Sequence, residues 1–109
     1  MKVAVVGSRN ARVNNLKLYL PPNTTEIVSG GASGVDRCAR ECALANGLRL
    51  TEFLPDYAHY RQGAPLRRND EIVDYADRVL AFWDGQSAGT RYVIERCREL
   101  QKPIMIIYV

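Results

Sequence analysis

Three short loops rich in glycine, serine and threonine carry the residues best suited to bind an anion. They span residues 7–10, 29–36 and 84–90, and each follows an apolar run and precedes a segment with helical spacing. The free N–H groups at a helix start favour a negatively charged group. Strand-to-helix loops of a parallel sheet all leave from its carboxyl edge, so the three loops should meet there. The pattern predicts a phosphate-binding rim.

The loop at residues 29–36 has the clearest local signals. Gly30 and Gly31 permit a sharp turn with positive φ, Ser33 is predicted to cap the next helix, and Asp36 completes a variant capping box. A helix dipole favours an anion by only about 0.3 to 1 kcal/mol, so one such loop binds phosphate weakly. An equally good interpretation is that the glycines only serve a tight turn. Because the Walker A and dinucleotide patterns are both missing, P-loop ATP hydrolysis is disfavoured.

The last loop repeats this design. Gly85, Gly89 and Thr90 offer backbone donors and a hydroxyl, and Ser87 or Thr90 is expected to cap the final helix. Asp84 follows a strand directly, where ligand-contacting groups usually stand. Contact with a ribose hydroxyl, contact with a metal, and simple capping of a turn all remain open for this carboxylate.

Alternating strand and helix patterns must position these loops. Helical spacing marks residues 16–20, 35–43, 72–76 and 92–100. Five near-continuous apolar runs predict parallel strands at Val3 to Val6, Glu26 to Val28, Leu48 to Leu54, Arg78 to Trp83 and Ile104 to Val109. Because crossovers between parallel strands are right-handed, the alternation predicts one doubly wound, three-layer α/β domain spanning residues 1–109.

Composition sets the broad class of the protein. A chain of 109 residues that is 47% hydrophobic is long enough to bury one core. The formal net charge of +3 is spread along the chain, which permits nucleic-acid binding without indicating it. No apolar run approaches about 18 residues and no cleavable leader is recognisable, so we expect a cytoplasmic protein without membrane insertion.

The cysteines and the single histidine do not suggest a metal site. Cys38 and Cys42 share a helix face and Cys97 lies on another helix, but one histidine in the whole chain leaves zinc short of ligands. We expect three buried thiols in a reducing compartment. His59 stands between two tyrosines, where a surface or stacking role is favoured over general-base catalysis.

Pro55 to Leu66 is the one long irregular stretch that the sequence predicts. Its aromatic and basic side chains are Tyr57, His59, Tyr60 and Arg61. With Gly63 and Pro65 as hinges, this stretch is predicted to stack over a base while arginines hold phosphate; the alternative is a packed surface loop. Asn69 has a second interpretation, as the cap of a helix beginning near Asp70.

Four motifs in order resemble the SLOG superfamily, and within it the small YspA/cpYpsA-related group. They are Gly7-Ser8-Arg9, the loop at 29–36, Pro55-Asp56 with Arg68-Asn69, and Trp83-Asp84-Gly85 with Ser87 and Gly89-Thr90. The resemblance runs from Val3 to Val109. Relatives include the DNA-processing protein DprA, the phosphoribohydrolases often labelled lysine decarboxylases, and nucleotide-sensing domains. It implies a Rossmann-like sheet of order 3-2-1-4-5, a nucleotide-derived ligand and a homodimer.

The resemblance also implies which residues bind the ligand. They are Ser8, Arg9, Gly30, Gly31, Ser33, Gly34, Arg68, Asn69, Gly89 and Thr90. From the loops themselves we add Gly7, Asp36, Asp84, Gly85 and Ser87 as candidate binding residues. No cofactor and no metal are assigned. Val93 holds the place of the catalytic glutamate in the hydrolases' Pro-Gly-Gly-x-Gly-Thr-x-x-Glu pattern. Glu95, two residues on, is rotated by about 200° around the helix, so hydrolysis through that residue is doubtful.

Three function classes follow from these observations. The leading hypothesis is a binding or sensing domain for a nucleotide derivative such as an ADP-ribose-like or cyclic molecule. The second is an enzyme cleaving an N-glycosidic or phosphoribosyl bond through Asp36, Asp84 or Glu71. The third is a DprA-like single-stranded DNA binder, which is weakest because only Arg61, Arg67 and Arg68 approach a basic stripe.

Overall fold

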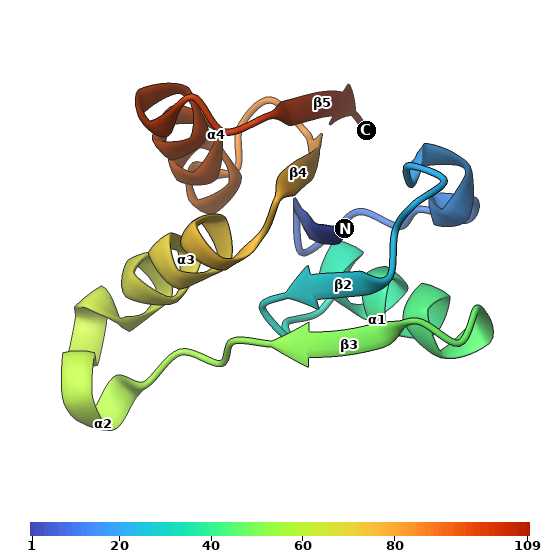
Figure 1. Cartoon of the computed structure of the whole chain (residues 1–109). Coiled ribbons are helices and arrows are strands. Elements are labelled where there is room, and N and C mark those ends of the chain that lie inside the picture. Colours follow the sequence, from blue (N-terminus) through green and yellow to red (C-terminus); the bar gives the residue numbers. More distant parts are fainter.

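The computed structural model describes all 109 residues and contains one five-stranded sheet with the order β3-β2-β1-β4-β5. All four strand pairs are parallel. The strands are β1 Lys2–Gly7, β2 Glu26–Ser29, β3 Arg49–Glu52, β4 Arg78–Trp83 and β5 Ile104–Tyr108. The five strands and the predicted order 3-2-1-4-5 are therefore confirmed, with β3 and β5 at the two edges (Figure 1).

Three longer helices and three short helical segments connect the strands. The long ones are α1 Val35–Ala45, α3 Ala64–Tyr75 and α4 Ala88–Leu100, and the short ones are η1 Leu16–Tyr19, α2 Tyr57–Tyr60 and η2 Arg61–Gly63. The first crossover thus carries only one 3-10 turn. Pro21 and Pro22 follow it after one residue and lack the N–H groups that a longer helix would need.

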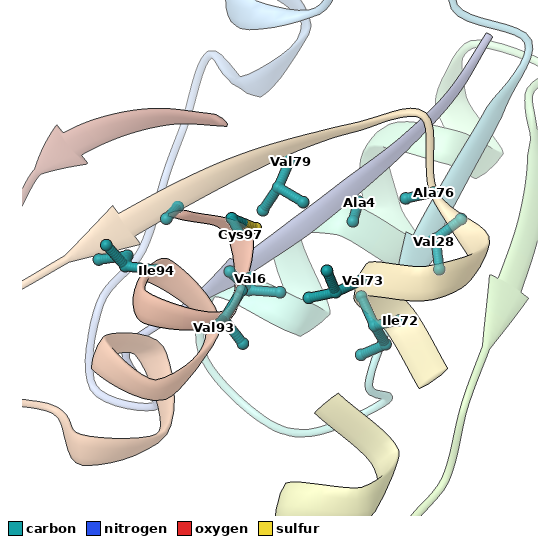
Figure 2. Packing of buried hydrophobic residues seen from close by; sticks show 11 residues of the cluster. Ala4, Val6, Val28, Ile72, Val73, Ala76, Val79, Val93, Ile94 and Cys97 are labelled. Atoms are coloured by element: carbon teal, nitrogen blue, oxygen red, sulfur yellow. The ribbon is translucent and has the colours of Figure 1, made fainter. Parts of the chain in front are cut away.

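Alternating side chains bury both faces of the sheet. On β1, Val3 and Val5 pack with α1 and η1, whereas Ala4 and Val6 belong to the cluster formed with α3 and α4. Figure 2 shows this second cluster, in which valines of the sheet meet Ile72 and Val73 of α3 and Val93 and Cys97 of α4. The predicted three-layer α/β arrangement is confirmed, because helices cover each face.

The stretch at residues 55–66 differs from its prediction. It is largely helical, since α2 and η2 lead straight into α3, and the prediction of a long irregular loop is wrong. Helix α3 begins at Ala64, six residues before the predicted start near Asp70. Pro65 lies in its first turn, where the missing N–H costs nothing. None of the helices is both long and apolar enough to span a membrane.

The cysteines are all free thiols. Cys38 and Cys97 are buried, as expected, whereas Cys42 is partly exposed. Burial raises the pKa of Cys97 to about 11, so this thiol is protonated and unreactive at neutral pH.

Candidate functional site

A cavity of about 550 Å³ opens at the carboxyl edge of β1, β2 and β4, with α3 and α4 forming a wall. Its volume lies within the range typical of small-molecule pockets. Eleven of the fifteen predicted site residues line it: Gly7, Ser8, Arg9, Gly30, Asp36, Arg68, Asn69, Asp84, Ser87, Gly89 and Thr90. The three loops therefore do meet at one edge of the sheet.

The four remaining predicted residues do not line the cavity. Gly31, Gly34 and Gly85 have φ of 69°, 70° and 83°, a region that favours glycine, and Ser33 is exposed. A side chain at Gly34 would collide with the backbone of Arg9. The three glycines permit these turns, and at Gly31 and Gly34 this agrees with the interpretation of the loop at residues 29–36 as a tight turn.

Eight lining residues were not predicted from the sequence. They are Val6, Asn10, Ala32, Pro65, Leu66, Ile72, Gln86 and Val93. On α3, Pro65, Arg68 and Ile72 recur at helical spacing and so present one face to the cavity. That signal becomes readable only once the helix is known to start at Ala64.

The first loop joins the ends of β1 and β4. A side chain at Gly7 would lie 2.6 Å from both the Phe82 carbonyl and Val35, so α1 starts directly against β1. The buried Ser8 donates its N–H to the Phe82 carbonyl at 3.2 Å, and its Oγ accepts from the N–H of Asp84 at 3.3 Å. Arg9 is exposed at the cavity, and its side chain makes no hydrogen bond or ion pair within the protein.

The start of α1 carries a buried carboxylate. The predicted cap at Ser33 is wrong, because Gly34 is the N-cap residue and no side chain caps this helix. Asp36 instead accepts a hydrogen bond from the N–H of Ala32 at 3.1 Å through Oδ2. Burial raises the pKa of Asp36, and the Ala32 N–H and the charge of Arg68 partly oppose that rise.

Arg68 ties α3 to the ends of β2 and β3. It is only 8% exposed, and its Nη1 donates to the Gly30 carbonyl at 2.7 Å and to the Phe53 carbonyl at 3.4 Å. Its Nε donates to Oδ1 of Asn69 at 2.9 Å. Asn69 therefore lies within α3 and orients Arg68, so the alternative interpretation of Asn69 as a helix cap is wrong.

The third loop is built around Asp84. Its Oδ1 accepts from the N–H groups of Gln86 and Ser87, both at 2.8 Å, and these bonds lower the pKa of Asp84. Asp84 thus caps the turn. Ser87 is the N-cap residue of α4, but its hydroxyl contacts Thr90 Oγ1 at 3.4 Å instead of capping the backbone. No group of the protein accepts from the N–H groups of residues 88–90, the first turn of α4.

Comparison with known proteins identifies the family. A family model described as DNA recombination-mediator protein A matches residues 1–55. The chain belongs to this family. The match covers β1, β2, α1 and β3 with the first two loops, and it confirms the SLOG-type resemblance. No significant match was found among curated proteins or among solved structures.

In this member of the DNA recombination-mediator protein A family, the aromatic side chains of α2 lie outside the cavity. Tyr57 and Tyr60 are 56% and 38% exposed, and Arg67 lies over the ring of Tyr60 at 5.4 Å. His59 is exposed beside Tyr60, with 4.6 Å between the ring centroids. From residues 55–66 only Pro65 and Leu66 reach the cavity, so no stacking lid covers it.

The carboxylates available to an enzyme are fewer than the sequence suggested. Val93, at the position that the resemblance assigns to the hydrolases' glutamate, lines the cavity, whereas Glu95 and Glu71 are exposed and lie outside it. Asp36 and Asp84 are the two carboxylates of the cavity wall. Arg9 and Arg68 are the two cationic lining residues, so the lining has no net charge.

Proposed function

We propose that the cavity binds a nucleotide or nucleotide derivative and that the domain senses or carries this ligand, as expected for the YspA-related group. One observation carries the proposal. Buried Arg68 and Asp36 and the unpartnered N–H groups at the start of α4 converge on a single cavity of about 550 Å³. Such a mixture of an apolar wall with a few placed polar groups is typical of small-molecule sites.

The start of α4 is the best place for the phosphate. Its first-turn N–H groups at residues 88–90 have no acceptor in the protein, and the hydroxyl of Thr90 lies beside them. The start of α1 is less suitable, because Asp36 adds a negative charge there. Arg9 has no partner in the protein and is therefore available to pair with the phosphate.

A helix terminus alone does not supply enough free energy to bind a nucleotide with micromolar affinity. Micromolar binding needs about 8 kcal/mol, of which the helix start supplies at most about 2 kcal/mol. A charge-assisted bond from Arg9 adds about 1.5 to 3 kcal/mol. The remainder falls to polar contacts at Arg68 and to apolar contact with Leu66, Ile72 and Val93.

Calorimetry with a panel of nucleoside monophosphates and NAD tests this proposal. Arg9→Ala should weaken binding about tenfold or more, whereas Arg12→Ala, an exposed arginine outside the cavity, should not. Gly89→Asp should also weaken binding, because a Cβ there lies 4.0 Å from its nearest neighbour, Asn69 Nδ2, and the carboxylate adds negative charge to the cavity wall. If both cavity variants bind as well as the parent, the site is misplaced.

A second candidate, single-stranded nucleic acid, is favoured by the description of the matching family. Exposed aromatic and basic side chains lie along α2, η2 and the start of α3, namely Tyr57, Tyr60, Arg61 and Arg67, and Arg67 lies over the Tyr60 ring. Fluorescence anisotropy with a labelled oligothymidylate tests it. This candidate requires affinity that falls steeply with salt and is lost in Tyr60→Ala and Arg67→Ala.

A further inference from the structure

We infer that the cavity selects ribonucleotides over 2′-deoxyribonucleotides, because the Asp36 carboxylate is placed to accept a hydrogen bond from the ribose 2′-hydroxyl. The inference rests on the proposed function and specifies which part of the nucleotide faces which wall. The phosphate would lie at the start of α4, and the sugar at Asp36, Arg68 and Asn69.

Asp36 has an acceptor that the protein leaves open. The residue is 8% exposed and lines the cavity. Its Oδ2 accepts from the Ala32 N–H, and the buried Ser29 hydroxyl, which has no other partner, is a second donor of the protein that acts on this carboxylate. Oδ1 itself accepts no hydrogen bond of normal length, and Arg68 forms no ion pair with the carboxylate. Burying a carboxylate without full hydrogen bonding is costly. A donor supplied by the ligand would offset that cost.

Donors without a partner line the same cavity. Arg68 Nη2 and Asn69 Nδ2 have no acceptor in the protein, and both residues line the cavity. A hydroxyl group both donates and accepts, so the vicinal hydroxyls of ribose match one open acceptor beside open donors. A phosphate would match the donors but would be repelled by Asp36. In Rossmann-like sites, an acidic residue often binds the ribose 2′-hydroxyl in this way.

Gly30 brings the two charged side chains to the same place. A side chain at this position would collide with the Arg68 guanidinium and would lie 3.0 Å from Asp36 Oδ2. The absence of a side chain at Gly30 therefore lets Asp36, from α1, and Arg68, from α3, approach one another across the end of β2.

Calorimetric titration of the full chain tests the inference. The probes are the four ribonucleoside 5′-monophosphates and their 2′-deoxy counterparts. Because a hydrogen bond to a charged group is strong, the parent should prefer the ribo form by about tenfold or more. Asp36→Asn should reduce that preference to about threefold or less, since it removes the charged acceptor. Asp74→Asn, the same change at an exposed aspartate of α3 outside the cavity, should retain it.

The outcomes separate this inference from the proposed function. Equal affinity for the two sugars in the parent, or an unchanged preference in Asp36→Asn, overturns the inference and leaves nucleotide binding intact. If no nucleotide binds, both fail. The affinity of the parent protein for 2′-O-methyl nucleotides tests the inference without any substitution, because their 2′-oxygen cannot donate a hydrogen bond to Asp36. Binding as weak as that of the deoxy form supports the inference, and binding as tight as that of the ribo form refutes it.

Discussion

Removal of the Arg68 side chain should destabilise this protein far more than removal of the arginine beside it. Arg68 is buried and holds three oxygen acceptors, two of them backbone carbonyls at the ends of β2 and β3. Arg67 is exposed and contacts only the ring of Tyr60 among the aromatic side chains. The two residues are adjacent in sequence, so Arg67→Ala is a matched control for Arg68→Ala.

The expected magnitude follows from the hydrogen bonds. The bonds from Arg68 to the Gly30 carbonyl at 2.7 Å and to Asn69 Oδ1 at 2.9 Å have good lengths and a charged donor. Each contributes about 1.5 to 3 kcal/mol, whereas the 3.4 Å contact with Phe53 contributes little. Water enters the space left by the truncation and replaces part of the loss. We therefore expect a decrease of about 3 kcal/mol in the free energy of unfolding, out of a total of about 5 to 15 kcal/mol.

Urea denaturation measures this decrease directly. Arg68→Ala should lower the midpoint clearly, with an unchanged slope, whereas Arg67→Ala should stay within about 1 kcal/mol of the parent. If Arg68→Ala also costs less than about 1 kcal/mol, the hydrogen bonds at the ends of β2 and β3 do not hold the cavity together. Because this variant changes structure as well as charge, its ligand affinity is less informative than that of Arg9→Ala.

Three further predictions concern pH, chemistry and assembly. Asp36 has a raised pKa in the folded state, so the folded state binds the proton more tightly than the unfolded state does. The contribution of Asp36 to the free energy of unfolding therefore falls as the pH rises through the raised pKa. Asp36→Asn should remove that fall, as measured by urea denaturation of parent and variant across the acid range. Release of free base from nucleoside monophosphates should be negligible by chromatography. Val93→Glu is the substitution most expected to change this, and robust turnover by the parent that Asp84→Asn abolishes would overturn the sensor hypothesis. The uncharged edge strand β5 exposes Met105 and Tyr108, so sedimentation should show a dimer. Met105→Lys should disrupt this dimer. A parent protein that is monomeric at high micromolar concentration would contradict the prediction.

The sequence by itself determined the sheet and the edge at which the loops gather. Apolar runs such as Arg78 to Trp83 are local signals, and the strand β4 has these same bounds in the structure. The alternation of strands with helical segments implies parallel pairing, which sends every strand-to-helix loop to the carboxyl edge. The resemblance to a known superfamily supplied the order of the strands.

Tertiary structure alone decided which contacts the candidate site residues make within the protein. Arg68 donates to a carbonyl 38 residues away, and the Ser8 hydroxyl accepts from an N–H group 76 residues away. Such contacts cannot be read from the spacing of nearby residues. Local spacing therefore predicts that Asp36 belongs to a capping box and allows Asn69 to be a helix cap, and the structure contradicts both. Burial is likewise a property of the assembled layers. Burial raises the pKa of Asp36. Two N–H groups that donate to the exposed Asp84 lower its pKa instead, although each aspartate lies in a loop or helix start that follows a strand.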